Sequence, residues 1–159
     1  MKDLDISLVE ADLKDCQQIL DMQIESFKSL LQKYQDYDTN PAAESLEHIQ
    51  HRMAQNFTDY YFIHLNDQKI GVIRVVAAEN DVFKISPIFI LPEFQGKGYA
   101  KQAILKMEMR YPNARKWELA TIKQEVGLCR FYESLGYKVT GRKTPIKTDM
   151  TIIGYSKNL

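Results

Sequence analysis

The stretch PEFQGKGYAKQAI, residues 92–104, decides the architecture that we expect of this chain. It follows the apolar run VFKISPIFIL and opens a segment whose apolar residues recur at helical spacing up to Pro112. The stretch therefore lies where a strand passes into a helix. Gly96 and Gly98 leave the backbone bare at this point, and the first amides of a helix have no partners within the helix. Such a junction favours an anion, and a pyrophosphate fits it.

Two well-known phosphate-binding loops do not match these residues. A P-loop needs Lys followed by Ser or Thr after its last glycine, whereas Tyr99 follows Gly98. A dinucleotide fingerprint needs a third glycine where Lys101 stands, and it belongs to a first βαβ unit that this chain lacks. A nucleotide-binding protein that uses the same glycines stays as an alternative, and it predicts affinity for ATP or NAD over coenzyme A.

Hydrophobic periodicity over the rest of the chain predicts a mixed order of helices and strands. A first helix follows Asp12 as N-cap, with Leu13 and Tyr34 on its apolar face. Asn40 and Pro41 predict the start of a second helix, whose inner face would include Leu46, Ile49, Met53 and Phe57. Strands are expected at residues 6–9, 60–65, 70–77, 82–91, 117–122, 137–141 and 151–157, and further helices at residues 100–111 and 126–135.

This order is β-α-α-β-β-β-α-β-α-β-β, without an internal repeat or a linker, so we expect one domain over residues 1–159. The segment 82–122 is a strand, a helix and a strand, whose two strands should run parallel. The other strands form hairpins, which predicts a mixed α/β fold with a mostly antiparallel sheet. Pro87 lies inside the third central strand and marks an edge, a bulge or a break there.

Composition and charge narrow the class of protein. The chain of 159 residues has 21 basic and 21 acidic residues, which argues against a partner that is nucleic acid or a membrane surface. Cys16 and Cys129 lack metal-type spacing, so we expect two buried thiols and no metal. The first ten residues do not resemble a signal peptide, and no apolar run is long enough to span a membrane. We therefore expect a soluble, cytoplasmic protein.

Two motifs in this order resemble the GNAT superfamily of acyl-CoA-dependent N-acetyltransferases. The first is ILPEFQGKGYA, residues 90–100, and the second is FYESLGY, residues 131–137. The resemblance implies a mixed, mostly antiparallel sheet of six to seven strands that splays at its parallel pair, flanked by about four helices. It implies transfer of an acetyl group from acetyl-CoA to a primary amine by direct attack. It also implies a homodimer formed through the C-terminal strands.

The resemblance assigns roles to particular residues. The pyrophosphate of acetyl-CoA would bind the amides of Gln95, Gly96, Lys97, Gly98, Tyr99 and Ala100. The pantetheine arm would pair with the strand around Ile88, Phe89 and Ile90, beside Phe131. Tyr132 would protonate the departing thiolate, and the amide of Ile90 would face the oxyanion. A core position on the helix is the alternative interpretation of Tyr132.

Other features leave alternatives open. The family often has an asparagine near the start of the second motif's helix that contacts pantetheine. In this sequence the candidate positions are occupied by Glu125 and Leu128, which puts that contact in doubt. Candidates for the base that deprotonates the amine are Glu25, His64, Glu79, Asp81 and Glu118, each also readable as a surface or structural residue. The connection KYQDYDTNPAAES, with Tyr34, Asp36, Tyr37 and Asp38, could hold a cationic amine or be a polar loop. A non-catalytic acyl-CoA-binding module of the same fold is the alternative function.

Overall fold

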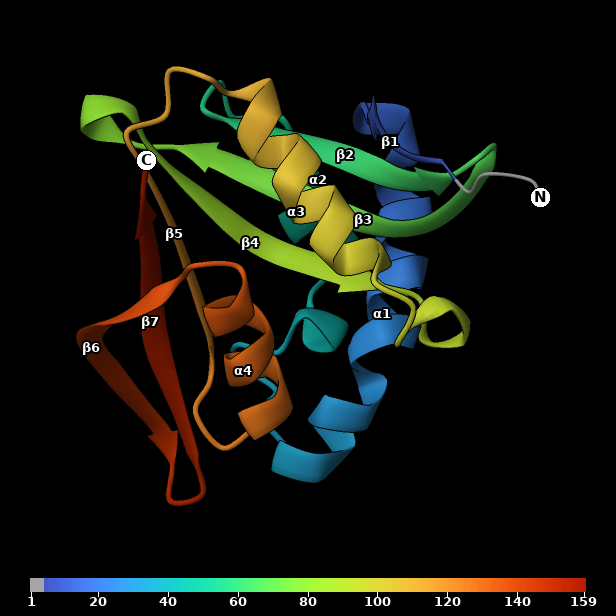
Figure 1. Ribbon diagram of the computed structural model, residues 1–159. Coiled ribbons are helices and arrows are strands. Elements are labelled where there is room, and N and C mark those ends of the chain that lie inside the picture. Colours follow the sequence, from blue (N-terminus) through green and yellow to red (C-terminus); the bar gives the residue numbers. More distant parts are fainter. Residues whose placement is uncertain (1–4) are drawn as a thin grey trace.

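The structure, a computed structural model, describes residues 5–159, which form a seven-stranded sheet between two layers of helices (Figure 1). The strand order is β1-β2-β3-β4-β5-β7-β6, and within this range β4 and β5 are the one parallel pair. The strands are β1 (Ile6–Glu10), β2 (Thr58–Leu65), β3 (Gln68–Ala77), β4 (Val82–Ile90), β5 (Lys116–Ile122), β6 (Lys138–Lys147) and β7 (Met150–Asn158). The α-helices are α1 (Cys16–Tyr34), α2 (Leu46–Met53), α3 (Tyr99–Arg110) and α4 (Val126–Ser134). The expected element order, sheet and parallel pair are confirmed.

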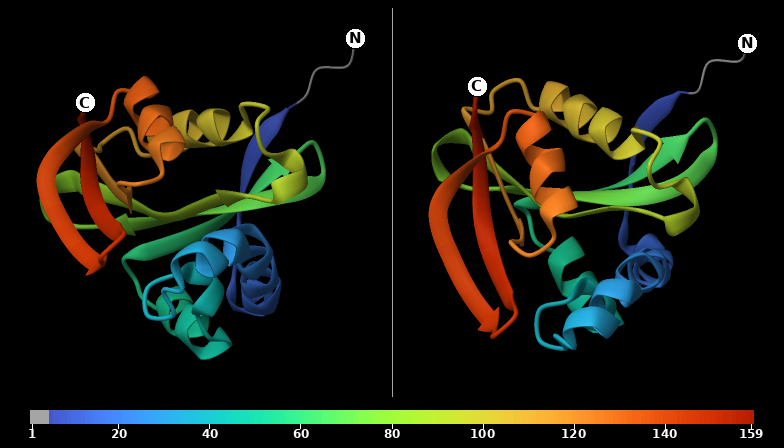
Figure 2. Two further views of the ribbon diagram at one scale, coloured as in Figure 1. Left: turned by 90° about the horizontal axis from the view of Figure 1, so that it is seen from below. Right: turned by 60° about the horizontal axis from the view of Figure 1, so that its bottom comes forward.

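The helices cover the two faces of the sheet in pairs. α3 and α4 lie on one face and α1 and α2 on the other, which is clearest when the molecule is seen from below (Figure 2). The face under α3 and α4 buries a large cluster that includes Ile104, Trp117 and Tyr132. The face under α1 and α2 buries a second cluster that includes Ile19 and Phe89. Side chains of β4 thus contribute to both cores, because successive residues of a strand point to opposite faces.

The parallel pair is held together over only a short length. β4 and β5 are paired from Val82 to Lys84 with Lys116 to Glu118, and beyond these residues the two strands diverge (Figure 1). We call the diverging parts, residues 85–90 of β4 and 119–122 of β5, the splay. A register shift opposite Arg74 sets two residues of β4, Ser86 and Pro87, against one residue of β3. Pro87 therefore lies at a bulge, one of the three positions that the sequence allowed.

A glycine of β3 fixes the open end of β4. Gly71 pairs in register with Ile90, and a Cβ atom on Gly71 would lie 2.2 Å from the carbonyl oxygen of Phe89. A larger residue would therefore push β3 away from β4. The close approach holds the last residues of β4 firmly to β3 on one side while their other side faces the splay.

Three sequence expectations about the N-terminal half were wrong in detail. Asn40 caps a 3-10 turn, Pro41–Ala43, through a hydrogen bond from the Ala42 amide at 2.7 Å, and α2 begins later with Ser45 as its N-cap. Phe57 lies beyond the end of α2 and is half exposed. Asp12 caps a 3-10 turn that leads into α1, so Leu13 is exposed rather than buried. At Asp12 and at Asn40, a short capped 3-10 turn replaces the first turn of the expected helix.

Two further observations concern the chain as a whole. Cys16 and Cys129 are free and buried, as the sequence predicted. None of the helices in residues 5–159 is long and apolar enough to cross a membrane.

Candidate active site

The loop between β4 and α3 exposes its backbone. A 3-10 turn, Pro92–Phe94, leads into residues 95–98, which we call the glycine loop, and α3 begins at Tyr99. Gly96 and Gly98 have φ angles of 77° and 83°, in the region that favours glycine. No atom of the described chain lies within 4 Å of a Cβ built on either glycine. The loop therefore combines a left-handed backbone with open space above it.

The amides of this loop are available to a ligand. Within residues 5–159, no carbonyl or side chain accepts a hydrogen bond from the amides of residues 96–101. The first amide of α3 that has an acceptor is that of Gln102, which donates to the Gly98 oxygen at 3.2 Å. Lys97 is exposed, Ala100 is half-buried, and the Tyr99 ring is buried in the core, which anchors the start of α3. Free amides at a helix N-terminus attract a negative group.

Gln95 has a different place from the rest of the loop. Its backbone amide donates to the Pro92 oxygen at 3.2 Å, and its side-chain Nε2 donates to the carbonyl oxygen of Ile90 at 2.8 Å. Both bonds tie the loop to the end of β4. Gln95 thus holds the glycine loop in position with its side chain, and its own amide already has an acceptor.

The backbone of Ile88 and Ile90 faces the splay. The Leu91 amide donates to the Ile70 oxygen of β3 at 2.8 Å, so the amide of Ile90, the residue before it, points to the opposite side. The same alternation turns the backbone of Ile88 to the splay and that of Phe89 to β3. This edge of β4 has no partner from β5, because their pairing ends at Lys84. An extended ligand could pair there as an additional strand.

Tyr132 lies on α4, on the same face of the sheet as the glycine loop's helix. Its side chain is buried in the core beside Phe131, with ring centroids 5.2 Å apart, and burial raises the pKa of Tyr132 to about 12. The hydroxyl donates no hydrogen bond to any residue from Asp5 onward. Tyr132 is therefore a protonated phenol whose proton has no acceptor in the described chain.

The start of α4 carries a polar cluster from two parts of the chain. Glu125 accepts hydrogen bonds from the Tyr34 hydroxyl at 2.5 Å and from Lys33 Nζ at 2.7 Å, both at the end of α1. These bonds, the Lys33 bond first, hold the pKa of Glu125 below its usual value. Tyr34 also packs against Ile122 at the end of β5. The cluster links α1 to the β5 side of the splay.

The comparison with family models decides which family this is. The model described as "Acetyltransferase (GNAT) domain" matches residues 20–158. The chain belongs to this family. Both motifs that carried the resemblance lie within the matched residues.

Solved structures share the GNAT fold along the whole chain. The acetyltransferase of Thermus thermophilus has a TM-score of 0.79 at 14% identity, with 100% of both chains covered. The PaiA N-acetyltransferase of Thermoplasma acidophilum, solved with coenzyme A, has a TM-score of 0.76 at 17% identity and covers 98% of this chain and 99% of its own. The ribosomal-protein-S18-alanine N-acetyltransferase of Escherichia coli has a TM-score of 0.77 at 12% identity, and the match covers 97% of this chain and 94% of that one. No curated protein sequence matches the chain significantly.

The candidate bases of this GNAT domain are scattered. Glu79 and Asp81 lie in the turn before β4, at the paired end of the strands, and Glu118 is in the paired part of β5. His64 is on β2 beside β1, and Glu25 is exposed on α1, where it forms an ion pair with Lys28 at 3.1 Å. Glu79, Asp81 and Glu118 therefore lie away from the open end of the splay, and β3 separates His64 from β4.

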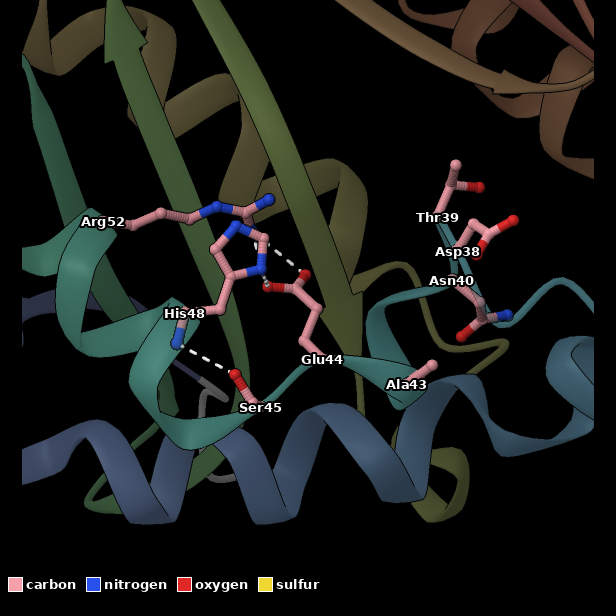
Figure 3. A pocket seen from close by; sticks show the side chains of 8 residues that line it. All are labelled: Asp38, Thr39, Asn40, Ala43, Glu44, Ser45, His48 and Arg52. Atoms are coloured by element: carbon pink, nitrogen blue, oxygen red, sulfur yellow. Dashed lines mark hydrogen bonds and ion pairs between the residues drawn. The ribbon is translucent and has the colours of Figure 1, made fainter.

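The acidic and aromatic side chains of the connection between α1 and α2 have separate places in the structure. Asp36 is buried, and its carboxylate accepts hydrogen bonds from the amides of Asp38 and Thr39 at 3.2 and 3.1 Å, so it stabilises the turn. Tyr37 is exposed, and Tyr34 donates to Glu125. Asp38 remains, exposed at the rim of a pocket of about 490 Å³ between the connection and α2 (Figure 3).

A polar cluster behind this pocket was missed by the sequence analysis. It contains Glu44 and Arg52, which line the pocket, and Tyr60 and Arg74 from β2 and β3. One signal was present, because Arg74 is the charged residue inside the apolar run IGVIRVVA. Among the described residues, no group of three or more His, Cys, Asp or Glu side chains could hold a metal ion.

Proposed function

We propose that this protein transfers an acetyl group from acetyl-CoA to a primary amine, with both substrates bound together. One observation carries the proposal: the edge of β4 that has no strand partner, at Ile88 and Ile90, leads through one 3-10 turn into a glycine loop whose amides are free from Gly96 onward. An edge that can pair with an amide-rich chain and a loop that can hold a pyrophosphate are the two parts that coenzyme A needs. The PaiA N-acetyltransferase, which has this fold, was solved with coenzyme A.

The residues present fit this cosubstrate. The amides of Gly96, Lys97, Gly98, Tyr99 and Ala100 would hold the pyrophosphate, and Gln95 would hold the loop in place. Open space above both glycines allows phosphate oxygens close to the backbone. The backbone of Ile88 and Ile90 would pair with the pantetheine arm, which lies beside Phe131 in this proposal. Bound acetyl-CoA supplies an activated acyl group as a thioester.

The chain's residues then act on the reacting atoms. The neutral amine attacks the thioester carbonyl, a C–N bond forms and the C–S bond breaks. The amide of Ile90 faces the splay, where it can donate to the carbonyl oxygen as negative charge develops on it. Gly71 and Gln95 fix Ile90 from its two sides, through the close contact with β3 and the bond to its carbonyl oxygen. The proton that the amine loses passes to solvent.

Tyr132 supplies the proton that the sulfur needs. Its pKa of about 12 lies above the value of about 10.4 for an alkylammonium group, so the phenol is still protonated at pH values where part of the amine is already neutral. Transfer of its proton to the departing thiolate prevents the reverse attack, and the phenolate that is left takes a proton back from solvent. Phe131 packs against the ring and restricts its orientation.

A non-catalytic acyl-CoA-binding module is the second candidate. The scattered positions of the candidate bases favour it, because Glu79, Asp81 and Glu118 lie at the paired end of the strands. The buried Tyr132 favours catalysis, because a module that only binds needs no proton donor beside the thioester.

A transfer assay separates the two candidates. Purified protein is incubated with acetyl-CoA and a panel of primary amines, release of the free thiol is followed by a chromogenic disulfide, and acetylated products are identified by mass spectrometry. Thiol release that depends on an amine, together with an amine product heavier by one acetyl group, supports the enzyme. Saturable binding of acetyl-CoA without any product supports the module.

A further inference from the structure

The pocket between α2 and the α1–α2 connection is lined by Glu44, His48 and Arg52, and a second arginine lies behind it. Arg52 and His48 both reach Glu44 from α2, at 2.9 and 3.1 Å, with Asp38 to Asn40 on the other side of the pocket (Figure 3). Arg74 lies behind them, close enough to Arg52 and Glu44 for both to act on its pKa. Two guanidinium groups therefore lie near one carboxylate, and of the two only that of Arg52 is paired with it.

Arg74 is the unusual member of this cluster. Its side chain is buried, at 8% exposure, and it forms no ion pair with any residue that the structure describes. Its hydrogen bonds go to neutral oxygens, from Nε to Thr58 Oγ1 and from Nη1 to the Ser86 carbonyl, each at 2.9 Å. Burial is the main cause that lowers the pKa of Arg74. A buried cation without a counter-ion is costly, and a bound anion would offset that cost.

A second buried group beside Arg74 also lacks a partner. Tyr60 pairs in register with Arg74, and the guanidinium of Arg74 lies 5.8 Å from the centre of the Tyr60 ring. The Tyr60 hydroxyl is fully buried and, among residues 5–159, makes no hydrogen bond. A hydroxyl and two guanidinium groups together are a set of donors that suits a carboxylate.

Short stretches of chain lead from the walls of the pocket to both sides of the splay. Arg74 binds the carbonyl oxygen of Ser86, which is in the bulge of β4 four residues before Ile90, about 13 Å along an extended strand. The opposite wall begins at Asp38, four residues after Tyr34, and Tyr34 contacts the end of β5. An amine acceptor that reaches the thioester could therefore extend into this pocket.

We propose that the Arg52–Arg74–Tyr60 cluster binds a carboxylate of the acceptor, so that the preferred substrate is an amine that carries a carboxylate group. This inference rests on the proposed function and names its substrate class. Glu44 keeps Arg52 extended over the pocket, and Arg74 supplies the charge that remains unpaired. Asp38 is at the exposed rim and takes no part in binding the carboxylate.

The test uses matched pairs of acceptors. A series of straight-chain ω-amino acids is compared with the n-alkylamines of the same length, and kcat/KM is measured for each with acetyl-CoA at saturation. The wild-type protein should prefer the amino acid by about ten- to hundredfold at the best length, the range that charge-assisted hydrogen bonds provide. Arg52→Gln and Arg74→Met should each remove most of this preference, mainly through KM for the amino acid, so that the ratio of the two kcat/KM values within each pair approaches one.

Two controls keep the outcome clear. Asp38→Asn changes the charge at the rim of the same pocket and should leave the preference for the amino acid unchanged. If the pocket instead bound a second ammonium group of the acceptor, this variant would lose its preference for that acceptor. Arg142→Gln removes an exposed arginine on β6 and should have no effect. If Arg74→Met does not fold, Arg52→Gln alone tests the carboxylate site. Arg52 is partly exposed on α2, so its substitution should leave the fold intact.

The remaining outcomes separate this inference from the proposed function. Acetylation of alkylamines or polyamines as efficient as that of the amino acids would overturn the carboxylate site and leave the acetyltransferase intact. A preference that survives both arginine substitutions would also overturn it. Failure to acetylate any amine would overturn both proposals.

Discussion

The Nε2 atom of Gln95 donates to the carbonyl oxygen of Ile90 at 2.8 Å, and this bond joins the glycine loop to the open end of β4. The loop and the strand edge would otherwise be separate binding features. Because the bond fixes their relative position, a ligand that pairs with Ile88 and Ile90 also reaches the free amides of residues 96–101. Gln95→Ala should therefore weaken acetyl-CoA binding, measured by calorimetry, although the Gln95 side chain touches no ligand in this account.

The glycine loop can be tested with a matched pair of substitutions. Gly98→Asp places a carboxylate beside the amides proposed for the pyrophosphate, so bulk and like charge should raise the Kd for coenzyme A by roughly a hundredfold or more. Gly141→Asp is the control, because Gly141 has a similar φ of 92° and open space but lies on β6. Both substitutions therefore place a side chain on a backbone with a similar positive φ. Equal losses of affinity in the two would contradict the assignment of the loop.

Tyr132→Phe should reduce turnover without weakening acetyl-CoA binding. Loss of a proton donor typically costs a factor of 10² to 10⁴ in rate, so we expect kcat to fall by about a hundredfold. Tyr137→Phe is the control, because its hydroxyl binds Glu108 at 2.9 Å and plays no part in the chemistry proposed here. That variant should lose about 1 kcal/mol of stability and keep its kcat. Wild-type turnover in Tyr132→Phe would make Tyr132 a packing residue.

The pH dependence of turnover follows from the same residue. Burial raises the pKa of Tyr132 to about 12, so only about one phenol in a hundred is ionised at pH 10. The profile of kcat/KM should rise with pH as the acceptor amine loses its proton and should not fall again up to pH 10. A descending limb centred near pH 9 that disappears in Tyr132→Phe would show that the phenol ionises earlier than this environment allows.

The Glu125 cluster predicts a contribution to stability that depends on pH. Because Lys33 and Tyr34 lower the pKa of Glu125 on folding, the contribution is fully present above the unfolded value of about 4.3 and is lost as pH falls through the lower folded value. Glu125→Gln should lower the unfolding free energy by about 1 kcal/mol at pH 7. The difference from wild type should shrink below about pH 4 in urea titrations. Glu79→Gln, at an exposed turn, should show no such dependence.

The sequence predicted the elements that have strong local signals. The alternation and turns of β2, β3 and β4 and the helical spacing of α3 gave the order and the one parallel pair. The glycine loop could be placed because its two glycines occur directly between an apolar strand and an amphipathic helix. Gly136, expected after α4, has a φ of 96°.

The parts that the sequence did not predict depend on contacts between distant residues. The start of α2 was misplaced because Asn40 and Ser45 are both good caps, and only the packed structure chooses between them. Glu125 was seen as a departure from the family, but its partners Lys33 and Tyr34 lie in a different part of the chain, at the end of α1. The cluster of Glu44, Arg52, Tyr60 and Arg74 comes from separate elements, and no local pattern connects them.

If the splay and the glycine loop bind acetyl-CoA, a thermal-shift comparison will show it. Protein alone is compared with protein in acetyl-CoA, coenzyme A, ATP and NAD at equal concentrations. A ligand at about a hundred times its Kd stabilises by roughly 2.7 kcal/mol, which should raise Tm by roughly 5 to 10 °C for a chain of this size. We predict this rise with acetyl-CoA and coenzyme A and none with ATP or NAD. A rise with ATP or NAD alone would mean that the glycine loop holds another phosphate and would contradict the account.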